Sequence, residues 1–178
     1  WDSSKHEIPE RVILKNNIFP TMFQILRDAQ PEAEIGCIYE WDGIKYVVDT
    51  LSTSYQEMVH PSKIYTDEMK NMSVKYIKEK KPVLGAFIFD NPDHVGHDKG
   101  HNTPEYYANL TELDGYIGEI IQATKDAGIY EKCIFIVTAD HGGINYGHGG
   151  KTLEEVETPF IIAGKGVKKG GEFQESMM

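Results

Sequence analysis

Short apolar runs alternate with segments of helical periodicity along most of the chain. Four of the runs, at 35–39, 83–89, 133–137 and 160–163, have the length and the β-branched or aromatic content of buried strands. The unbroken run at 83–89 is typical of a central strand that is covered on both faces. A shorter run, Tyr46-Val47-Val48, follows an Asp-Gly turn signal and predicts one more strand.

Three segments between these runs predict helices, because their apolar residues recur at three- and four-residue spacing. The first opens at Pro20, the second has Thr66 as its N-cap and ends before Pro82, and the third begins at Thr103-Pro104 and ends at Gly128. The expected apolar faces are Met22, Ile25, Leu26 and Ala29; Met69, Met72, Tyr76 and Ile77; and Tyr107, Leu110, Leu113, Ile117, Ile120, Ile121 and Thr124.

This alternation of helices and strands predicts an α/β protein with three layers, α/β/α, around a largely parallel sheet. The 178 residues are enough for one domain with a hydrophobic core. In sheets of this kind, functional side chains gather just beyond the carboxyl ends of the strands. The residues that follow the runs at 83–89 and 133–137 are therefore the first candidates for a functional site.

Composition narrows the functional classes. The formal net charge of -10 argues against binding to a nucleic-acid duplex. No apolar run approaches the roughly 20 residues that a membrane-spanning helix needs. Cys37 and Cys133 both fall in predicted buried strands, which favours core thiols over a disulfide.

Five side chains in three short, glycine-bearing motifs carry most of the candidate chemistry. They are Asp93, His97, Asp140, His141 and His148. Carboxylate and imidazole ligands together suit a divalent transition metal, and zinc above all. Five ligands exceed the three that one catalytic zinc usually takes from the protein, and they are one short of the six expected for a pair. We therefore predict two divalent cations and a further ligand elsewhere.

Gly96 is expected to let the chain fold into a tight loop, in which Asp93 and His97 reach the same ion. Asp90 and His94 repeat the same four-residue spacing and are an alternative pair. We prefer Asp93 with His97 because Gly96 directly precedes His97.

Asp140 and His141 are adjacent, so they can share an ion only where the chain turns, and Gly142-Gly143 is expected to provide that turn. His94 and His101 are candidates for supporting a ligand or facing the substrate.

Five segments also resemble motifs of one protein superfamily. They are Asn91–Gly100, Leu113–Gly118, Thr138–Gly142, Gly147–Gly149 and Thr158–Gly166. With them the chain resembles the alkaline phosphatase superfamily, and most closely its type I phosphodiesterase/nucleotide pyrophosphatase branch. The likeness is strong over residues 83–170 and loose before them.

The resemblance implies that Asp93, His97 and His148 hold one zinc and that Asp140 and His141 hold the other. It also implies a further aspartate and a Thr or Ser nucleophile near the first strand of the fold, for which we find no counterpart in this sequence. We therefore expect residues 1–178 to form one partial catalytic domain without the nucleophile segment and the C-terminal end, and to be inactive alone.

The activity implied is hydrolysis of a small phosphoric ester, either a phosphodiester or pyrophosphate or a phosphomonoester, by a two-zinc mechanism in the intact protein. The same resemblance implies a periplasmic or extracellular location. No pattern in the sequence predicts an oligomeric state.

Two alternatives remain at this stage. The position of Lys151, shortly after His148, resembles that of a lysine in the sulfatase branch, which favours a sulfatase-like hydrolase. The imidazole-rich ligand set instead favours zinc over the carboxylate-rich calcium site that the sulfatase branch resembles. The missing nucleophile favours a non-catalytic remnant of the fold that binds a metal or a partner.

Overall fold

The computed structural model describes residues 20–59 and 67–172. The strands are β1 (Ile35–Tyr39), β2 (Tyr55–Met58), β3 (Leu84–Ile88), β4 (Ile134–Thr138) and β5 (Phe160–Gly164). The helices are α2 (Met22–Ala29), α3 (Glu68–Lys80), α4 (Asp93–Lys99), α5 (Pro104–Asp126) and α6 (Leu153–Val156), with 3₁₀ turns η1 (Asp42–Tyr46) and η2 (Tyr130–Lys132).

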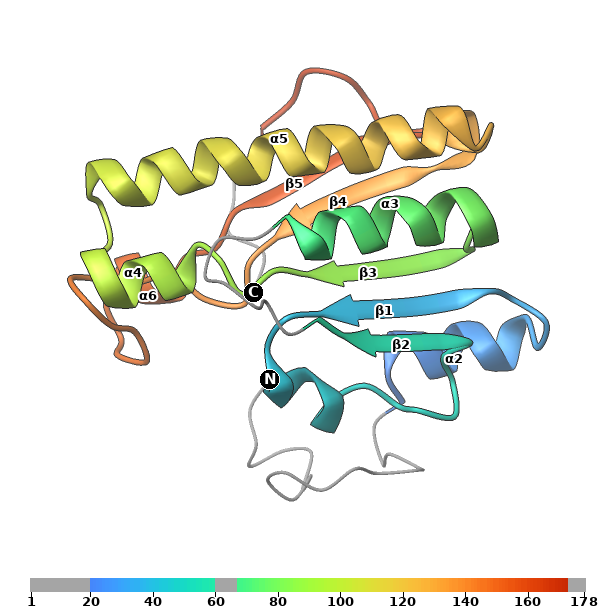
Figure 1. The fold of residues 1–178 in the computed structure, drawn as a ribbon, viewed down its shortest axis with the longest axis horizontal. Helices are drawn as coiled ribbons and strands as arrows, with labels where there is room; N and C mark the ends of the chain where they lie inside the picture. The colour runs from blue at the N-terminus through green and yellow to red at the C-terminus, as the bar shows by residue number, and fades with distance from the viewer. Residues whose placement is uncertain (1–19, 60–66, 173–178) are drawn as a thin grey trace.

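The strands form two sheets. The first, which we call the β1 sheet, is parallel and has the order β2-β1-β3. The second, the β4–β5 ribbon, is antiparallel. The carboxyl ends of β1, β3 and β4 point to the same side of the molecule, on the left in Figure 1, where α4 and α6 lie.

Helices cover both faces of the β1 sheet, which confirms the predicted α/β architecture with a parallel sheet. Alternate residues of β1 face opposite layers, as the two-residue period of a strand requires. Ile35 and Cys37 pack with Phe23 of α2, whereas Ile38 packs with Met69 of α3. Helix α5 lies on α3 and continues this outer layer through a cluster around Ile120 and Ala123 (Figure 1).

The strand predicted at Tyr46-Val47-Val48 is wrong. η1 ends at Tyr46, the chain turns at Val47, and Val48 is buried in the core rather than paired in a sheet. Asp49 then holds a turn, because its carboxylate accepts hydrogen bonds from Leu51 N at 2.9 Å and Ser52 Oγ at 2.9 Å. The strand that pairs with β1 comes later, at β2, where the sequence shows little apolar alternation.

Helix α2 begins later than predicted, at Met22, and shows a different face to the core. Thr21 is its N-cap and accepts a hydrogen bond from Gln24 N. Phe23 is buried, whereas Met22 and Ile25, which we expected to be buried, are exposed, as is Ala29.

The physical reason lies in Arg27, which the apolar pattern ignores. Its guanidinium donates to Ser52 O at 3.2 Å and to Ser54 Oγ at 2.8 Å. These bonds and the bulk of Phe23 together set the rotation of α2 on the sheet.

The other two predicted helices are present. The apolar stripe of α3 is confirmed, with Met69, Tyr76 and Ile77 buried, while its predicted N-cap, Thr66, lies outside the described residues. In α5 the Thr103 cap is confirmed, and it accepts from Tyr106 N.

The predicted face of α5 holds only in part. Ile120 and Thr124 are buried, but Tyr107 and Leu110 are exposed, because the first turns of α5 bury Asn109 instead. The first turns of α5 pack against α4, which is largely polar. A pattern of apolar residues therefore does not predict which side of these turns faces inward.

Two strand predictions differ from the structure in burial. β3 is an edge strand of the β1 sheet, with β1 at the centre. β4 is not buried on both faces, since Ile134 and Ile136 are exposed. Both cysteines are free, as expected; Cys37 is a core thiol whose pKa burial raises to about 12, whereas Cys133 is only half-buried and lies just before β4. Among the described helices, none has the length and apolarity to cross a bilayer.

Candidate metal centre

Asp93 and His97 lie on one face of a short helix rather than in a loop. Asp93 begins α4, with four residues between it and the end of β3, and His97 follows one turn later, at the i, i+4 spacing that brings side chains together on a helix. The predicted tight loop at Gly96 is therefore wrong, since Gly96 is a buried residue inside α4. Pairing of Asp93 with His97, however, agrees with the spacing argument.

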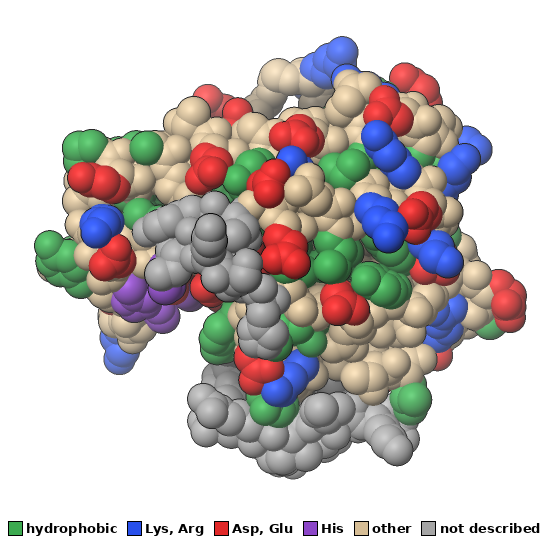
Figure 2. Space-filling view, in the orientation of Figure 1, with side chains coloured by type: hydrophobic (Ala, Val, Ile, Leu, Met, Phe, Trp, Pro, Cys, Tyr) green, Lys and Arg blue, Asp and Glu red, His purple; other side chains and the backbone are tan. Residues whose placement is uncertain are grey.

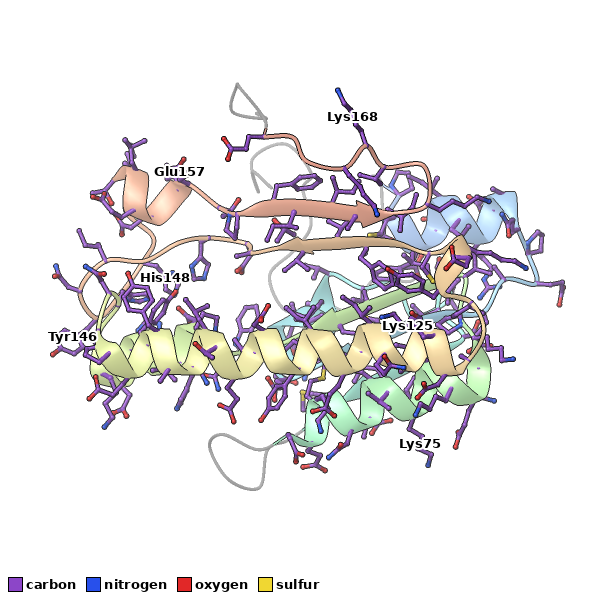
Figure 3. All side chains as sticks on the ribbon, turned by 90° about the horizontal axis from the view of Figure 1, so that it is seen from above. Lys75, Lys125, Tyr146, His148, Glu157 and Lys168 are labelled. Carbon is purple, nitrogen blue, oxygen red and sulfur yellow. The ribbon has the colours of Figure 1, made fainter. Side chains whose placement is uncertain are left out.

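His148 joins these two residues from a distant part of the chain. Its Nε2 lies 3.7 Å from Asp93 Oδ1, and His97 Nε2 lies 3.3 Å from Asp93 Oδ2. The three side chains, which we call the Asp93 cluster, each offer one ligand atom within 4.8 Å of the others. Two zinc–ligand bonds of about 2.0–2.1 Å can span the separations of 3.3 Å and 3.7 Å from Asp93 to the two imidazoles. The imidazoles form a surface patch in Figure 2, and Figure 3 places His148 and Tyr146 beside the end of the molecule where α5 begins.

The orientation of the His97 ring leaves its Nε2 available to a metal. Its Nδ1 lies 2.8 Å from the carbonyl oxygen of Tyr146. A carbonyl can only accept, so Nδ1 carries the proton and Nε2 presents a lone pair. Backbone carbonyls commonly fix metal-binding histidines in this way.

Asp93 Oδ1 has no hydrogen-bond partner among the described residues, although it is buried. A buried carboxylate oxygen without a partner is costly, and histidines or a cation normally compensate it. Here two imidazole nitrogens face it, at distances too long for hydrogen bonds. The donor set and the unpartnered oxygen therefore fit a divalent cation between Asp93, His97 and His148.

Asp140 and His141 follow β4 and approach the Asp93 cluster through stacked rings. The His141 ring lies on the His148 ring, with centroids 3.8 Å apart and an interplanar angle of 20°. His141 Nδ1 lies 2.8 Å from Gly142 O, which leaves its Nε2 3.7 Å from Asp140 Oδ2. The Asp140 side chain is 85% exposed. The five predicted residues thus form a continuous chain of contacts, but Asp140 lies at its open end.

The loop that carries His148 is held by Glu155, a residue outside the predicted set. The Glu155 carboxylate accepts from Gly150 N at 2.8 Å and from Thr152 Oγ1 at 2.8 Å, and its carbonyl accepts from Gly142 N at 2.9 Å. The hydroxyl of Thr152 and the amides of Gly150 and Thr152 lower the pKa of Glu155, and His148 adds to this. Thr152 and Glu155 form a capping box, so the Thr-x-x-Glu pattern before α6 was the available signal.

Other predicted residues lie around this centre with different roles. His94 is exposed on α4 and offers no atom to the cluster, and Lys151 is exposed on the loop before α6. The alternative pair Asp90 and His94 is not brought to His148. Burial raises the pKa of Asp90, and the nearby Asp93 charge adds to it. His101, in contrast, is buried beside Asp93.

An α/β protein with carboxylates and imidazoles gathered beyond its strand ends is equipped to bind divalent cations. A family profile described as type I phosphodiesterase / nucleotide pyrophosphatase matches residues 15–159. The chain therefore belongs to this family of metal-dependent hydrolases, within the alkaline phosphatase superfamily.

Similar proteins include hydrolases of two kinds. Bis(5'-adenosyl)-triphosphatase ENPP4 of Bos taurus is 29% identical over 104 residues, which are 57% of this chain and 23% of that protein. Arylsulfatase K of Danio rerio is 29% identical over 119 residues, 64% of this chain and 19% of that protein. Murine ectonucleotide pyrophosphatase / phosphodiesterase 5 aligns in structure with a TM-score of 0.49 and 22% identity, over 67% of this chain and 32% of that one. The chain thus spans less than a third of the length of each of these relatives.

Proposed function

We propose that the protein hydrolyses small phosphoric esters with the help of two divalent cations, with zinc as the favoured metal. The observation that carries the proposal is the Asp93 cluster, whose buried and unpartnered carboxylate oxygen faces imidazole nitrogens at the end of β3. Membership in the type I phosphodiesterase/nucleotide pyrophosphatase family supports this chemistry over other uses of such a cluster.

In this proposal the Asp93 cluster holds one cation, while Asp140 and His141 hold the other. When bound, such cations supply positive charge at the phosphoryl oxygens and lower the pKa of a hydroxyl nucleophile. The proposal also requires a sixth ligand and a Thr or Ser nucleophile, for which we find no counterpart in this sequence.

The residues of this chain contribute orientation. Tyr146 O holds the His97 ring with Nε2 toward Asp93, and Glu155 holds the loop from which His148 projects. The stacked rings of His141 and His148 keep the two proposed halves of the site together. Preorganised ligands of this kind need little rearrangement when substrate binds.

A sulfatase-like hydrolase is the second candidate. The similarity to arylsulfatase K, which covers more of this chain than that to ENPP4, favours it. The three imidazoles at the site count against the oxygen-only ligand sets that calcium prefers.

Turnover by the full-length protein tests the proposal. We expect it to hydrolyse p-nitrophenyl phosphate or bis(p-nitrophenyl) phosphate, to lose activity with a chelator and to regain it with Zn²⁺. Faster hydrolysis of p-nitrocatechol sulfate than of both phosphates would favour the sulfatase candidate. Full activity of His97→Ala or Asp140→Ala would reject the site.

A further inference from the structure

His101 is the most enclosed imidazole of the region, although it lies outside the Asp93 cluster. Its side chain is 7% exposed, compared with 47% for His97 and 32% for His148. It follows Gly100, whose φ of 95° ends α4, and precedes the Thr103 cap of α5. A buried polar ring at this junction requires a reason beyond packing alone.

Both edges of the His101 ring point to metal-binding segments. Nδ1 lies 3.1 Å from Asn145 O, which also accepts the backbone N–H of His101 at 2.6 Å. Nε2 lies 3.9 Å from Asp93 Oδ1. The next carbonyl along the chain, Tyr146 O, is the one that orients His97. One turn, Asn145-Tyr146, therefore holds two imidazoles of the α4 region just before His148.

Two glycines make room for this ring. A Cβ atom on Gly96 or on Gly143 would overlap Nε2 of His101. Neither glycine has a positive φ, so the backbone alone does not require glycine at these positions. Gly96 belongs to α4 and Gly143 to the loop after His141, so His101 is enclosed by two of the three metal-binding motifs and bonded to the turn that leads to the third.

Tyr106, in the first turn of α5, closes the remaining side. Its ring lies 5.3 Å from the His101 ring. Burial raises the pKa of the Tyr106 phenol, and the charge of Asp93 adds to this. The imidazole is thus in contact with α4, the loop after His141, the Asn145-Tyr146 turn and the first turn of α5.

We propose that His101 is a positioning residue that sets the relative placement of Asp93, His97 and His148, and that Gly96 and Gly143 are glycine in order to admit it. The inference rests on the proposed metal site but concerns a residue that donates no ligand atom in it. Outer residues that orient metal ligands typically change metal affinity 10–100-fold when they are lost.

The test is the affinity of the full-length protein for Zn²⁺, measured by competition with a chromophoric chelator. We expect His101→Ala to weaken zinc binding by about 10–100-fold. His101→Asn, which keeps a donor near the Nδ1 position, should recover most of the loss. His94→Asn, at an exposed imidazole of the nearby helix α4, is the matched control and should leave the affinity unchanged.

A double-mutant cycle separates positioning from general damage. Gly96→Ala should weaken zinc binding about tenfold in the wild-type background, because the methyl group displaces His101. In the His101→Ala background the same substitution should have no effect, since the space is then free. Gly118→Ala, at a glycine of α5 with open space around it, controls for the helix preference of alanine.

Each result has one meaning. Unchanged affinity in His101→Ala, or an equal loss from Gly96→Ala in both backgrounds, would overturn the inference, provided that thermal unfolding shows each variant to be folded. Absence of zinc binding by the wild-type protein would instead overturn the proposed function. The two failures are therefore distinguishable.

Discussion

The β1 sheet and the β4–β5 ribbon each lead into an acid–histidine motif, but their strands are buried to different extents. All five residues of the central strand β1 are buried, and its neighbour β3, which leads to Asp93, is half-buried except at Gly85, whereas β4 alternates between exposed and half-buried positions. The difference continues at the strand ends, where Asp93 is 32% exposed with one buried oxygen, while Asp140 is 85% exposed. Similar apolar runs and similar acid–histidine motifs thus lie in a more closed and a more open part of the proposed site. The burial of a strand depends on the helices and strands packed around it more than on its own sequence. The same packing determines how firmly a ligand residue at the end of the strand is held.

The largest contrast is expected in folding stability. Ile38→Ala in β1 should lower the free energy of unfolding by about 3 kcal/mol, because it empties a fully buried site. Ile136→Ala in β4, where the side chain is 56% exposed, should cost less than about 1 kcal/mol. Urea unfolding of both variants of the full-length protein measures this. Equal costs would break the comparison, since they would mean that Ile136 is also buried there.

The next contrast concerns metal affinity. Asp93→Ala should weaken binding of the first Zn²⁺ by about 100-fold or more, since loss of a ligand exceeds the 10–100-fold typical of outer residues. Asp140→Ala should leave that binding event nearly intact and remove only the second one. Calorimetric titration of the metal-free protein resolves the two events. The opposite order of losses would show that the open half binds first.

A smaller effect is expected from Glu155, which links the two halves through Gly142 and Gly150. Glu155→Gln keeps the size of the side chain but weakens the bonds to Gly150 N and Thr152, so zinc affinity should fall about tenfold. Glu154→Gln, at an exposed neighbouring carboxylate, is the control. Equal affinities in the two variants would show that the loop carrying His148 needs no such restraint.

The smallest predicted effect is a change with pH in the metal-free protein. The pKa of Glu155 is lowered in the folded state by hydrogen bonds from Thr152 and Gly150. Its carboxylate interactions are therefore present above the ordinary pKa of 4.5 and are lost as the pH falls through the lower, folded value. The Gly150 amide resonance should shift in that acidic window and should not do so in Glu155→Gln. A shift that begins well above pH 4.5 would mean that these hydrogen bonds do not control the Glu155 carboxyl.

Much of this molecule could be predicted from local pattern. The burial of β1, the Thr103 cap and the pairing of Asp93 with His97 follow from residue types and spacing, whereas the approach of His148 to them was implied by the family resemblance. The face of α2 could not be predicted, since Arg27 finds two of its partners, Ser52 and Ser54, 25 or more residues away. Strand β2 could not be predicted either, because its sequence shows little apolar alternation and it becomes a strand by pairing with β1.

The role of Gly96 shows the limit most clearly. A glycine before a histidine predicts a bend. In the structure, however, Gly96 lies inside α4, and its missing side chain leaves the space that the His101 ring occupies. No spacing rule reports a contact of this kind, because it depends on how three separate segments pack. Glycines without positive φ beside a buried ring are the feature to look for.

The length of α5 has a consequence for insertions and deletions. Its 23 residues run between the Thr103 cap at the metal centre and an ion pair of 2.8 Å between Lys78 and Asp126 at the far end. A rigid rod of about 34 Å anchored at both ends has a fixed phase, and one added residue would turn the distal end by about 100° and advance it by about 1.5 Å. Substitutions on its exposed side are therefore tolerable, but one residue more or fewer within α5 would misplace one of its two ends.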